Sequence, residues 1–170
     1  KKAVEDIVQI ISNNEKVDIV VGKVIYYYNE HCQEPEDIIW NTKKIKNRTG
    51  LDILACLMEN TLLPIWSVCR IIVKRELIVK NNIKFKVGVI SAEDLNFTIS
   101  IYKEVRKVAL LDDPFYYYLK TRNDSIMNSI SLKKCLDEIY IIDENSLEIF
   151  NKEHSEEFVS AFSVWMTRIL

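Results

Sequence analysis

The chain has 170 residues, and its balance of 48% hydrophobic and 28% charged residues excludes a disordered polypeptide. A net charge of −2 argues against nucleic acid as a partner, because no excess of basic residues is present to neutralise phosphates. The length suits one domain with a substantial core, and no apolar run approaches the roughly 18 residues that a membrane-spanning helix needs.

The scarcity of glycine and the placement of cysteine exclude further kinds of site. Gly22, Gly50 and Gly88 are too far apart to form a Gly-rich phosphate-binding loop. The four cysteines contain no Cys-x-x-Cys pair, and neither histidine has a second ligand at metal-binding spacing, so no metal site is predicted. We expect reduced, buried thiols and a cytoplasmic protein.

The first 60 residues predict an alternation of helices and strands. The predicted elements are a helix over 3–13, a strand over 17–28, a loop over 29–48 that contains a short strand at 38–40, and a helix over 51–60. The first helix has apolar residues at three-to-four spacing, whereas the strand is rich in β-branched and aromatic residues. Thr49 is a suitable N-cap for the second helix.

The remainder continues the same alternation and ends in helices. Residues 66–72 fit a short strand or the start of a helix. The elements predicted after them are a helix over 74–81, a strand over 83–85, a helix over 93–105, strands over 107–111 and 115–119, and helical segments from 131 to the end. Leu95, Ile99 and Tyr102 mark the buried face of the 93–105 helix. The pattern predicts an α/β fold with a sheet flanked by helices.

Glu93 and Asp94 form the first candidate for chemistry. These adjacent carboxylates stand where a predicted turn meets a predicted helix. A carboxylate aimed at a hydroxyl group can remove its proton as a general base. The alternative is a pair of acids that favour the start of the helix and keep it soluble, which is a common role in a first helical turn.

Aromatic and polar residues elsewhere form further candidates. The tyrosines at 116–118 are followed by Arg122 and Ser125 in a polar segment. Tyrosine rings such as that of Tyr118 can stack on sugar faces, and an arginine can clamp a phosphate. The alternative is a half-buried strand followed by a solvated loop. Trp66 is either part of a binding site or a core residue.

Taken in order, these fragments resemble the second half of bacterial family-2 glycosyltransferases, which have the GT-A fold. The matching residues are Trp66, Lys74-Arg75, Leu77, Asn81-Asn82-Ile83-Lys84-Phe85, Gly88, Glu93-Asp94, Tyr116-Tyr117-Tyr118, Arg122 and Ser125-Ile126. Asp18-Ile19-Val20 matches, more loosely, a strand that in the family follows the metal-binding carboxylates. Each fragment alone is weak evidence, and it is their order that carries the resemblance.

The resemblance implies an inverting transfer of a sugar from a nucleotide-sugar to the hydroxyl group of a glycan or glycolipid, in the synthesis of cell-surface polysaccharide or glycolipid. In the family the acidic pair lies in the acceptor site, which makes Asp94 the expected base and Glu93 the second candidate. Trp66 is then expected to line the acceptor pocket, and Tyr118 is expected to bind substrate. Arg122 and Ser125 are expected near the diphosphate or the acceptor.

The chain also departs from the family in ways that set further expectations. It lacks the opening strand and loop that hold the donor's base, the D-x-D motif that holds Mg²⁺ or Mn²⁺, and the Q-x-x-R-W signature of processive synthases. We therefore expect a piece of a larger enzyme that is inactive alone, uses no cofactor itself and binds nucleotide-sugar poorly, whereas the intact enzyme needs Mg²⁺ or Mn²⁺.

Removal of neighbouring strands would leave exposed sheet edges, through which we expect self-association. Residues 1–130 are expected to form the acceptor-side half of a GT-A domain, and residues 131–170 a helical extension. The expected location is the cytoplasm, with the inner face of the membrane as an alternative. The competing hypothesis for function is a non-catalytic interaction module derived from the same fold.

Overall fold

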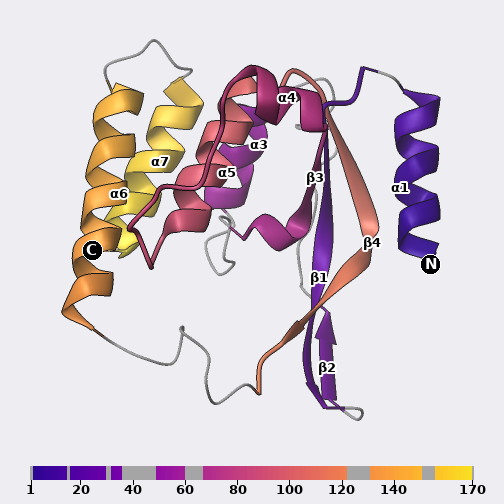
Figure 1. Cartoon of the computed structure of the whole chain (residues 1–170), viewed down its shortest axis with the longest axis horizontal. Coiled ribbons are helices and arrows are strands. Elements are labelled where there is room, and N and C mark those ends of the chain that lie inside the picture. Colours follow the sequence, from indigo (N-terminus) through magenta and orange to yellow (C-terminus); the bar gives the residue numbers. More distant parts are fainter. Residues whose placement is uncertain are drawn as a thin grey trace.

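The computed structural model describes residues 2–14, 16–29, 32–35, 49–59, 67–121, 131–150 and 156–169. Its elements, in chain order and with the labels of Figure 1, are α1 (Lys2–Asn13), β1 (Ile19–Asn29), β2 (Cys32–Pro35), α3 (Gly50–Glu59), the 3-10 helix η1 (Val68–Arg70), β3 (Ile71–Val73), α4 (Arg75–Lys80), α5 (Glu93–Glu104), β4 (Val108–Leu119), α6 (Leu132–Phe150) and α7 (Glu156–Ile169). The fold is therefore α/β, as the sequence predicts.

Strand β1 is the centre of a four-stranded mixed sheet. One edge of β1 pairs in parallel with β4 from residue 19 to residue 27. The other edge is shared by two antiparallel partners, β3 along residues 19–21 and β2 along residues 25–29. All strand pairing in the described part of the chain therefore passes through β1, whose continuous apolar start suits a strand covered on both faces.

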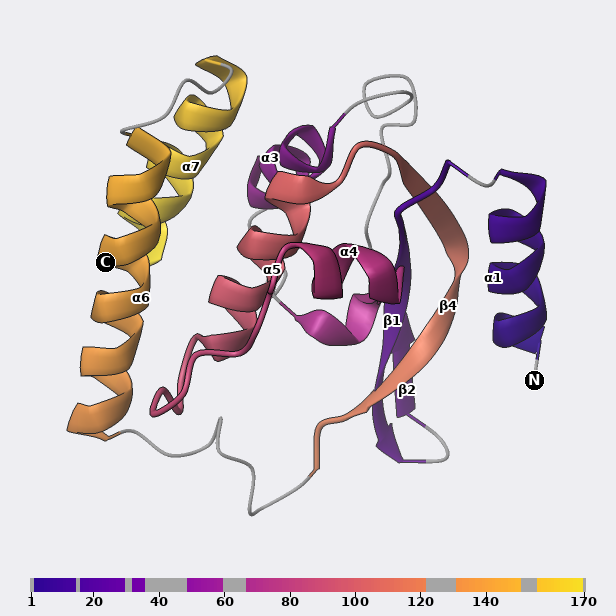
Figure 2. The same ribbon diagram turned by 45° about the horizontal axis from the view of Figure 1, so that its top comes forward.

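Helices cover both faces of this sheet in separate layers. Among the described helices, α1 is the one on one side of the sheet, where Val20 of β1 packs in a small cluster beneath it. On the other side α3 and α5 form the layer next to the sheet, and α6 and α7 form an outer layer (Figures 1 and 2). The alternation of side chains along β1 explains the two clusters, because Ile19 and Val21 face the helices opposite to α1.

The C-terminal helices share the main core with α3 and α5. Phe158, Phe162 and Trp165 of α7 are 0%, 0% and 4% exposed, so this apolar side of the helix packs against the rest of the fold. Ile141 and Ile149 of α6 join the same cluster. Among the described residues, no helix combines the length and the apolar character required to cross a membrane.

Most predicted helices are confirmed, and two predicted strand features are wrong. Residues 83–85 form no strand, because they pair with none of the described strands; Phe85 stacks on Phe97 of α5 with ring centroids 4.0 Å apart. The strands predicted over 107–111 and 115–119 are not separate, because β4 is continuous from Val108 to Leu119. Its extra residues form a bulge against β1 between Leu111 and Tyr116. The predicted strand at 38–40 lies outside the described residues.

Gly50 provides a test of how α3 is packed against α5. Its N–H donates to the Val105 carbonyl at 3.0 Å, and a Cβ atom added at this position would lie 2.1 Å from the backbone oxygen of Tyr102. We expect Gly50→Ala to lower the free energy of unfolding, measured by urea denaturation, by about 3 kcal/mol because a backbone atom must move.

The matched control is Gly22→Ala. Its added Cβ would meet only the ring of Phe115, at 2.2 Å, and a half-buried ring can rotate away. We expect a loss of about 1 kcal/mol for this variant. A larger loss for Gly22→Ala than for Gly50→Ala would contradict this description of the packing.

Candidate active site

The carboxylate of Asp94 is half-buried in the first turn of α5. Its Oδ2 accepts a long hydrogen bond of 3.5 Å from the backbone N–H of Val68. Burial raises the pKa of Asp94, the Val68 hydrogen bond opposes this shift, and the charge of Glu93 adds to it. A carboxylate in such surroundings holds a proton more strongly than an exposed aspartate, which is the property that a general base requires.

The start of α5 has no hydrogen bond from the side chain of its N-cap residue, Ala92. Ala92, the residue before the helix, has the left-handed conformation with φ of 62°, which is uncommon for a residue with a Cβ atom. Glu93 and Asp94 follow in the first turn, where the helix dipole favours anions. The predicted position of the acidic pair at a turn-to-helix junction is thus confirmed, whereas its catalytic role stays a prediction.

The 3-10 helix η1 connects this acidic pair to the predicted tyrosine strand. Val68 contacts Asp94, and the next residue, Cys69, forms a hydrogen bond with Tyr116 of β4 that raises the pKa of the tyrosine. The third residue, Arg70, is fully buried and exerts its charge on Tyr102 of α5. Two fragments that are far apart in the sequence therefore both contact η1.

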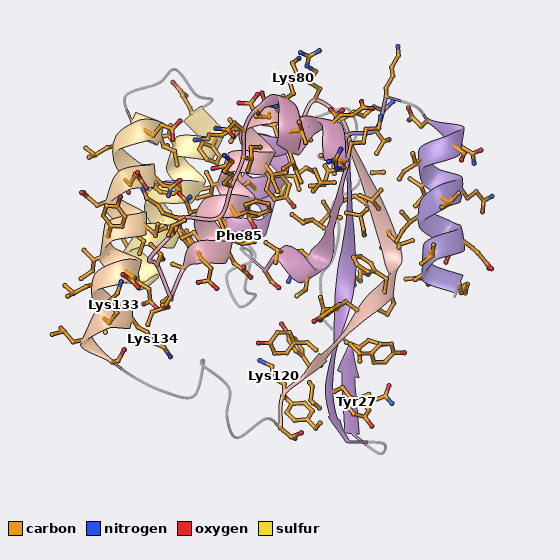
Figure 3. All side chains as sticks on the ribbon, in the orientation of Figure 1. Tyr27, Lys80, Phe85, Lys120, Lys133 and Lys134 are labelled. Atoms are coloured by element: carbon orange, nitrogen blue, oxygen red, sulfur yellow. The ribbon has the colours of Figure 1, made fainter. Side chains whose placement is uncertain are left out.

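Tyr118 lies further along β4, near the end of the sheet where Figure 3 labels Lys120 and Tyr27. Its ring meets that of Tyr26 edge-on with centroids 6.1 Å apart, and the Nζ of Lys120 lies 4.6 Å from the Tyr26 ring centroid and 5.1 Å from that of Tyr118. Three other predicted site residues lie outside the described residues, namely Trp66, Arg122 and Ser125.

A separate cleft opens at the opposite end of α5. It has a volume of about 460 Å³, and its lining includes Asn82, Lys84, Ser100 and Lys103. Neither Glu93 nor Asp94 contributes to it. The cleft is therefore no part of the candidate active site, which we place by the chemistry of the carboxylates.

No metal centre accompanies the carboxylates in the part of the chain that the structure describes, where no three acidic, histidine or cysteine side chains come together. Asp94 has Glu93 as its acidic neighbour. Two adjacent carboxylates do not form a complete cage for Mg²⁺ or Mn²⁺, because such ions take about six oxygen ligands. The requirement of an intact enzyme for Mg²⁺ or Mn²⁺ stays a prediction.

Sequence reasoning did not single out α6, which contacts the segment that leads into the acidic pair. We call residues 81–92, between α4 and α5, the 81–92 loop. Asp137 of α6 accepts a 2.9 Å hydrogen bond from the N–H of Ile90, and the Nζ of Lys133 donates to the Gly88 carbonyl at 2.9 Å. Figure 3 labels Lys133 at the lower part of α6. Charges at i and i+4 on a helix resemble an ordinary solvated pair in the sequence, so no signal distinguished them.

Comparisons with known proteins agree with this architecture. The chain is 34% identical over 74 residues to the glycosyltransferase EpsJ of Bacillus subtilis (strain 168), which is itself described as uncharacterized, and the match spans 44% of this chain and 21% of EpsJ. No protein-family model matches the sequence. The region of similarity is therefore a small part of the relative's length.

The structure resembles that of S. aureus TarS. A crystal structure of TarS residues 1–349 superposes with a TM-score of 0.59 at 20% identity, over 95% of this chain and 42% of that one. A second TarS crystal structure gives a TM-score of 0.60 at 19% identity, over 97% and 25% of the two chains. The similarity to EpsJ supports a relationship to glycosyltransferases, whereas the similarity to TarS shows a shared fold.

Asp94→Asn tests whether the surroundings disfavour the ionised carboxylate. Because burial raises the pKa of Asp94 in the folded chain, its ionisation reduces stability at pH values above that pKa. The amide carries no charge, so we expect the variant to have a higher Tm at pH 7, by on the order of 1–2 °C because Asp94 keeps partial contact with solvent.

The gain in Tm of Asp94→Asn should depend on pH. Below the ordinary aspartate value of 3.8 the carboxyl is protonated in both the folded and the unfolded chain, so the gain should vanish there. The difference in Tm is measured by thermal unfolding across pH 3–8 of Asp94→Asn, the unaltered chain and the control Glu93→Gln. A lower Tm for Asp94→Asn at pH 7 would show that the ionised form is favoured.

Proposed function

We propose that this chain forms the acceptor side of an inverting glycosyltransferase, in which Asp94 is the general base. The observation that carries the proposal is the half-buried Asp94 carboxylate at the start of α5, beside η1 and in the family's acidic position. The similarity to EpsJ supports it independently of the geometry. The donor is a nucleotide-sugar and the acceptor is a glycan or glycolipid hydroxyl, as in polysaccharide or glycolipid synthesis.

In this mechanism Asp94 takes the proton of the acceptor hydroxyl. The acceptor oxygen attacks the anomeric carbon of the donor sugar from the face opposite to the nucleotide, and a new glycosidic C–O bond forms as the bond to the diphosphate breaks. The nucleoside diphosphate leaves with the electron pair of that bond, and the sugar is inverted. Asp94 suits the first step because its surroundings favour the protonated state that it reaches.

Tyrosines on β4 are proposed to contact the sugar of the acceptor. Tyr116 forms a hydrogen bond with Cys69 of η1, the same short element whose Val68 N–H donates to Asp94. Tyr118 and Tyr26 present two further rings near the end of the sheet. Aromatic faces bind the apolar faces of sugars without requiring a fixed set of hydrogen bonds, which suits an acceptor that is itself part of a longer glycan.

The test compares Asp94→Asn with Glu93→Gln in the full-length native gene product. The assay measures release of UDP or GDP from a panel of UDP- and GDP-hexoses in the presence of a cell-envelope glycan and glycolipid extract. Loss of the base should lower kcat by at least about 10²-fold, whereas Glu93→Gln should change it by less than about tenfold.

Unchanged turnover in Asp94→Asn, with Glu93→Gln inactive, would assign the base to Glu93 and contradict the proposal. No turnover in the unaltered protein with any donor would favour the competing hypothesis of a non-catalytic interaction module. In that case acceptor binding, measured with the same glycan extract, would be the remaining activity to test.

A further inference from the structure

Four successive contacts fasten the 81–92 loop to α6. Besides the bonds of Asp137 and Lys133, the hydroxyl of Ser91 donates to Glu138 Oε1 at 2.6 Å, and the Nζ of Lys86 forms an ion pair with Glu144. Lys86 also lies 4.5 Å from the ring centroid of Tyr140. In Figures 1 and 2 this loop leaves α4, extends toward the N-terminal part of α6 and returns to α5.

One stripe of α6 supplies most of these partners. Lys133, Asp137, Tyr140 and Glu144 stand at i, i+4, i+7 and i+11, which places them on the same side of the helix. A loop that crossed α6 by chance would meet scattered residues, whereas this loop follows the stripe over about three helical turns. The contact is therefore a matched surface between two segments that are about 45 residues apart.

Asp137 is the central member of the stripe and the most buried of the four. It is 5% exposed, although aspartate is rarely buried unless it has partners. Its two oxygens are used by the Ile90 N–H and by Lys133, and the ion pair with Lys133 holds the pKa of Asp137 below its usual range. A hydrogen bond from a backbone amide to an ionised, buried carboxylate is about twice as strong as one between neutral groups.

The loop determines where Asp94 lies because it leads directly into α5. Ala92 is held in the left-handed region, and a strained residue persists only where its surroundings fix it. The residues before it, Ile90 and Ser91, are both bound by α6. Beyond Asp94, Asn96 is held in turn, since the buried side chain of Asn145 of α6 donates to its Oδ1 at 3.1 Å. Helix α6 therefore fastens the chain on both sides of Asp94.

We propose that Asp137 is a positioning residue, which sets the orientation and solvent access of the Asp94 carboxylate by holding Ile90 and, through Lys133, Gly88. The inference rests on the proposed function only in calling Asp94 the base. Asp137 itself touches neither Asp94 nor any reacting group, and it acts through the backbone of the 81–92 loop. The helical segment after residue 130 would then be part of the working site and not an appendage to it.

The experiment is carried out on this chain by NMR, without any assay of turnover. The titration midpoint of Asp94 is followed through its side-chain carboxyl ¹³C shift, together with the exchange rate of the Ile90 amide. In Asp137→Leu we expect the amide to exchange at least about tenfold faster, since its acceptor is lost. We also expect the Asp94 midpoint to fall toward the ordinary aspartate value, since a loosened loop admits water to the carboxylate.

Two further variants separate positioning from general damage. Asp137→Asn keeps an oxygen that can accept from the Ile90 N–H, so its Asp94 midpoint should stay close to that of the unaltered chain. Asp143→Leu makes the same change at an exposed position of α6 and should leave both readouts as in the unaltered chain. If Asp137→Leu does not fold, Lys133→Met decides instead, because it removes the bond to Gly88 and should move the Asp94 midpoint in the same direction.

An unchanged Asp94 midpoint in a folded Asp137→Leu variant, even with faster exchange at Ile90, would overturn the proposal and leave Asp137 as a local contact. An equal shift of the midpoint in Asp143→Leu would overturn it as well. Failure of the proposed function has a different signature, namely active Asp94→Asn enzyme alongside an Asp94 midpoint that still depends on Asp137. The two proposals can therefore fail separately.

Discussion

The architecture depends on hydrogen bonds at Asp18, immediately before β1. Its N–H donates to the Lys107 carbonyl at 2.9 Å, its carbonyl accepts from the Lys74 N–H at 3.0 Å, and its carboxylate accepts from the N–H groups of Arg106 and Lys107 at 2.9 and 3.2 Å. One residue thus joins the end of β3 and the start of β4 to β1, which fixes both registers at the same point. A single slip would turn Ile19 and Val21 away from the main core.

The register between β1 and β3 determines the position of η1, and η1 contacts Asp94 in the candidate active site. Because β3 begins directly after η1 and pairs with β1 over only 19–21, the position of η1 follows from that short pairing. Arg70 anchors the same element from inside, where it is fully buried close to Tyr102. The hydroxyl of Tyr102 has no hydrogen-bond partner in the described part of the chain. Its burial lowers the stability of the fold at the place where η1 packs against α5.

The sequence predicted the elements well where a single periodicity decides the outcome. The buried face of α5 at Leu95, Ile99 and Tyr102 is confirmed, since helical spacing of apolar residues suffices to define it. The prediction was wrong where pairing with a neighbouring strand determines the local structure. Residues 112–114 look like a turn because acids and proline favour turns, yet β1 continues past them and β4 absorbs them as a bulge. The GT-A assignment and the inverting mechanism stay predictions.

Helix α6 shows the limit of reading a site from one sequence. Its apolar residues Leu132 and Leu136 are exposed by 76% and 53%, whereas Asp137 and Asn145 are buried, which is the reverse of what hydrophobicity alone predicts. The inversion has a physical cause, because the 81–92 loop and α5 offer these polar side chains hydrogen-bond partners that the apolar side chains cannot use. Such partners lie 47 and 49 residues away along the chain, a separation at which local patterns carry no information. The acidic pair could be found from its local pattern, but the elements that orient it could be found only from the fold.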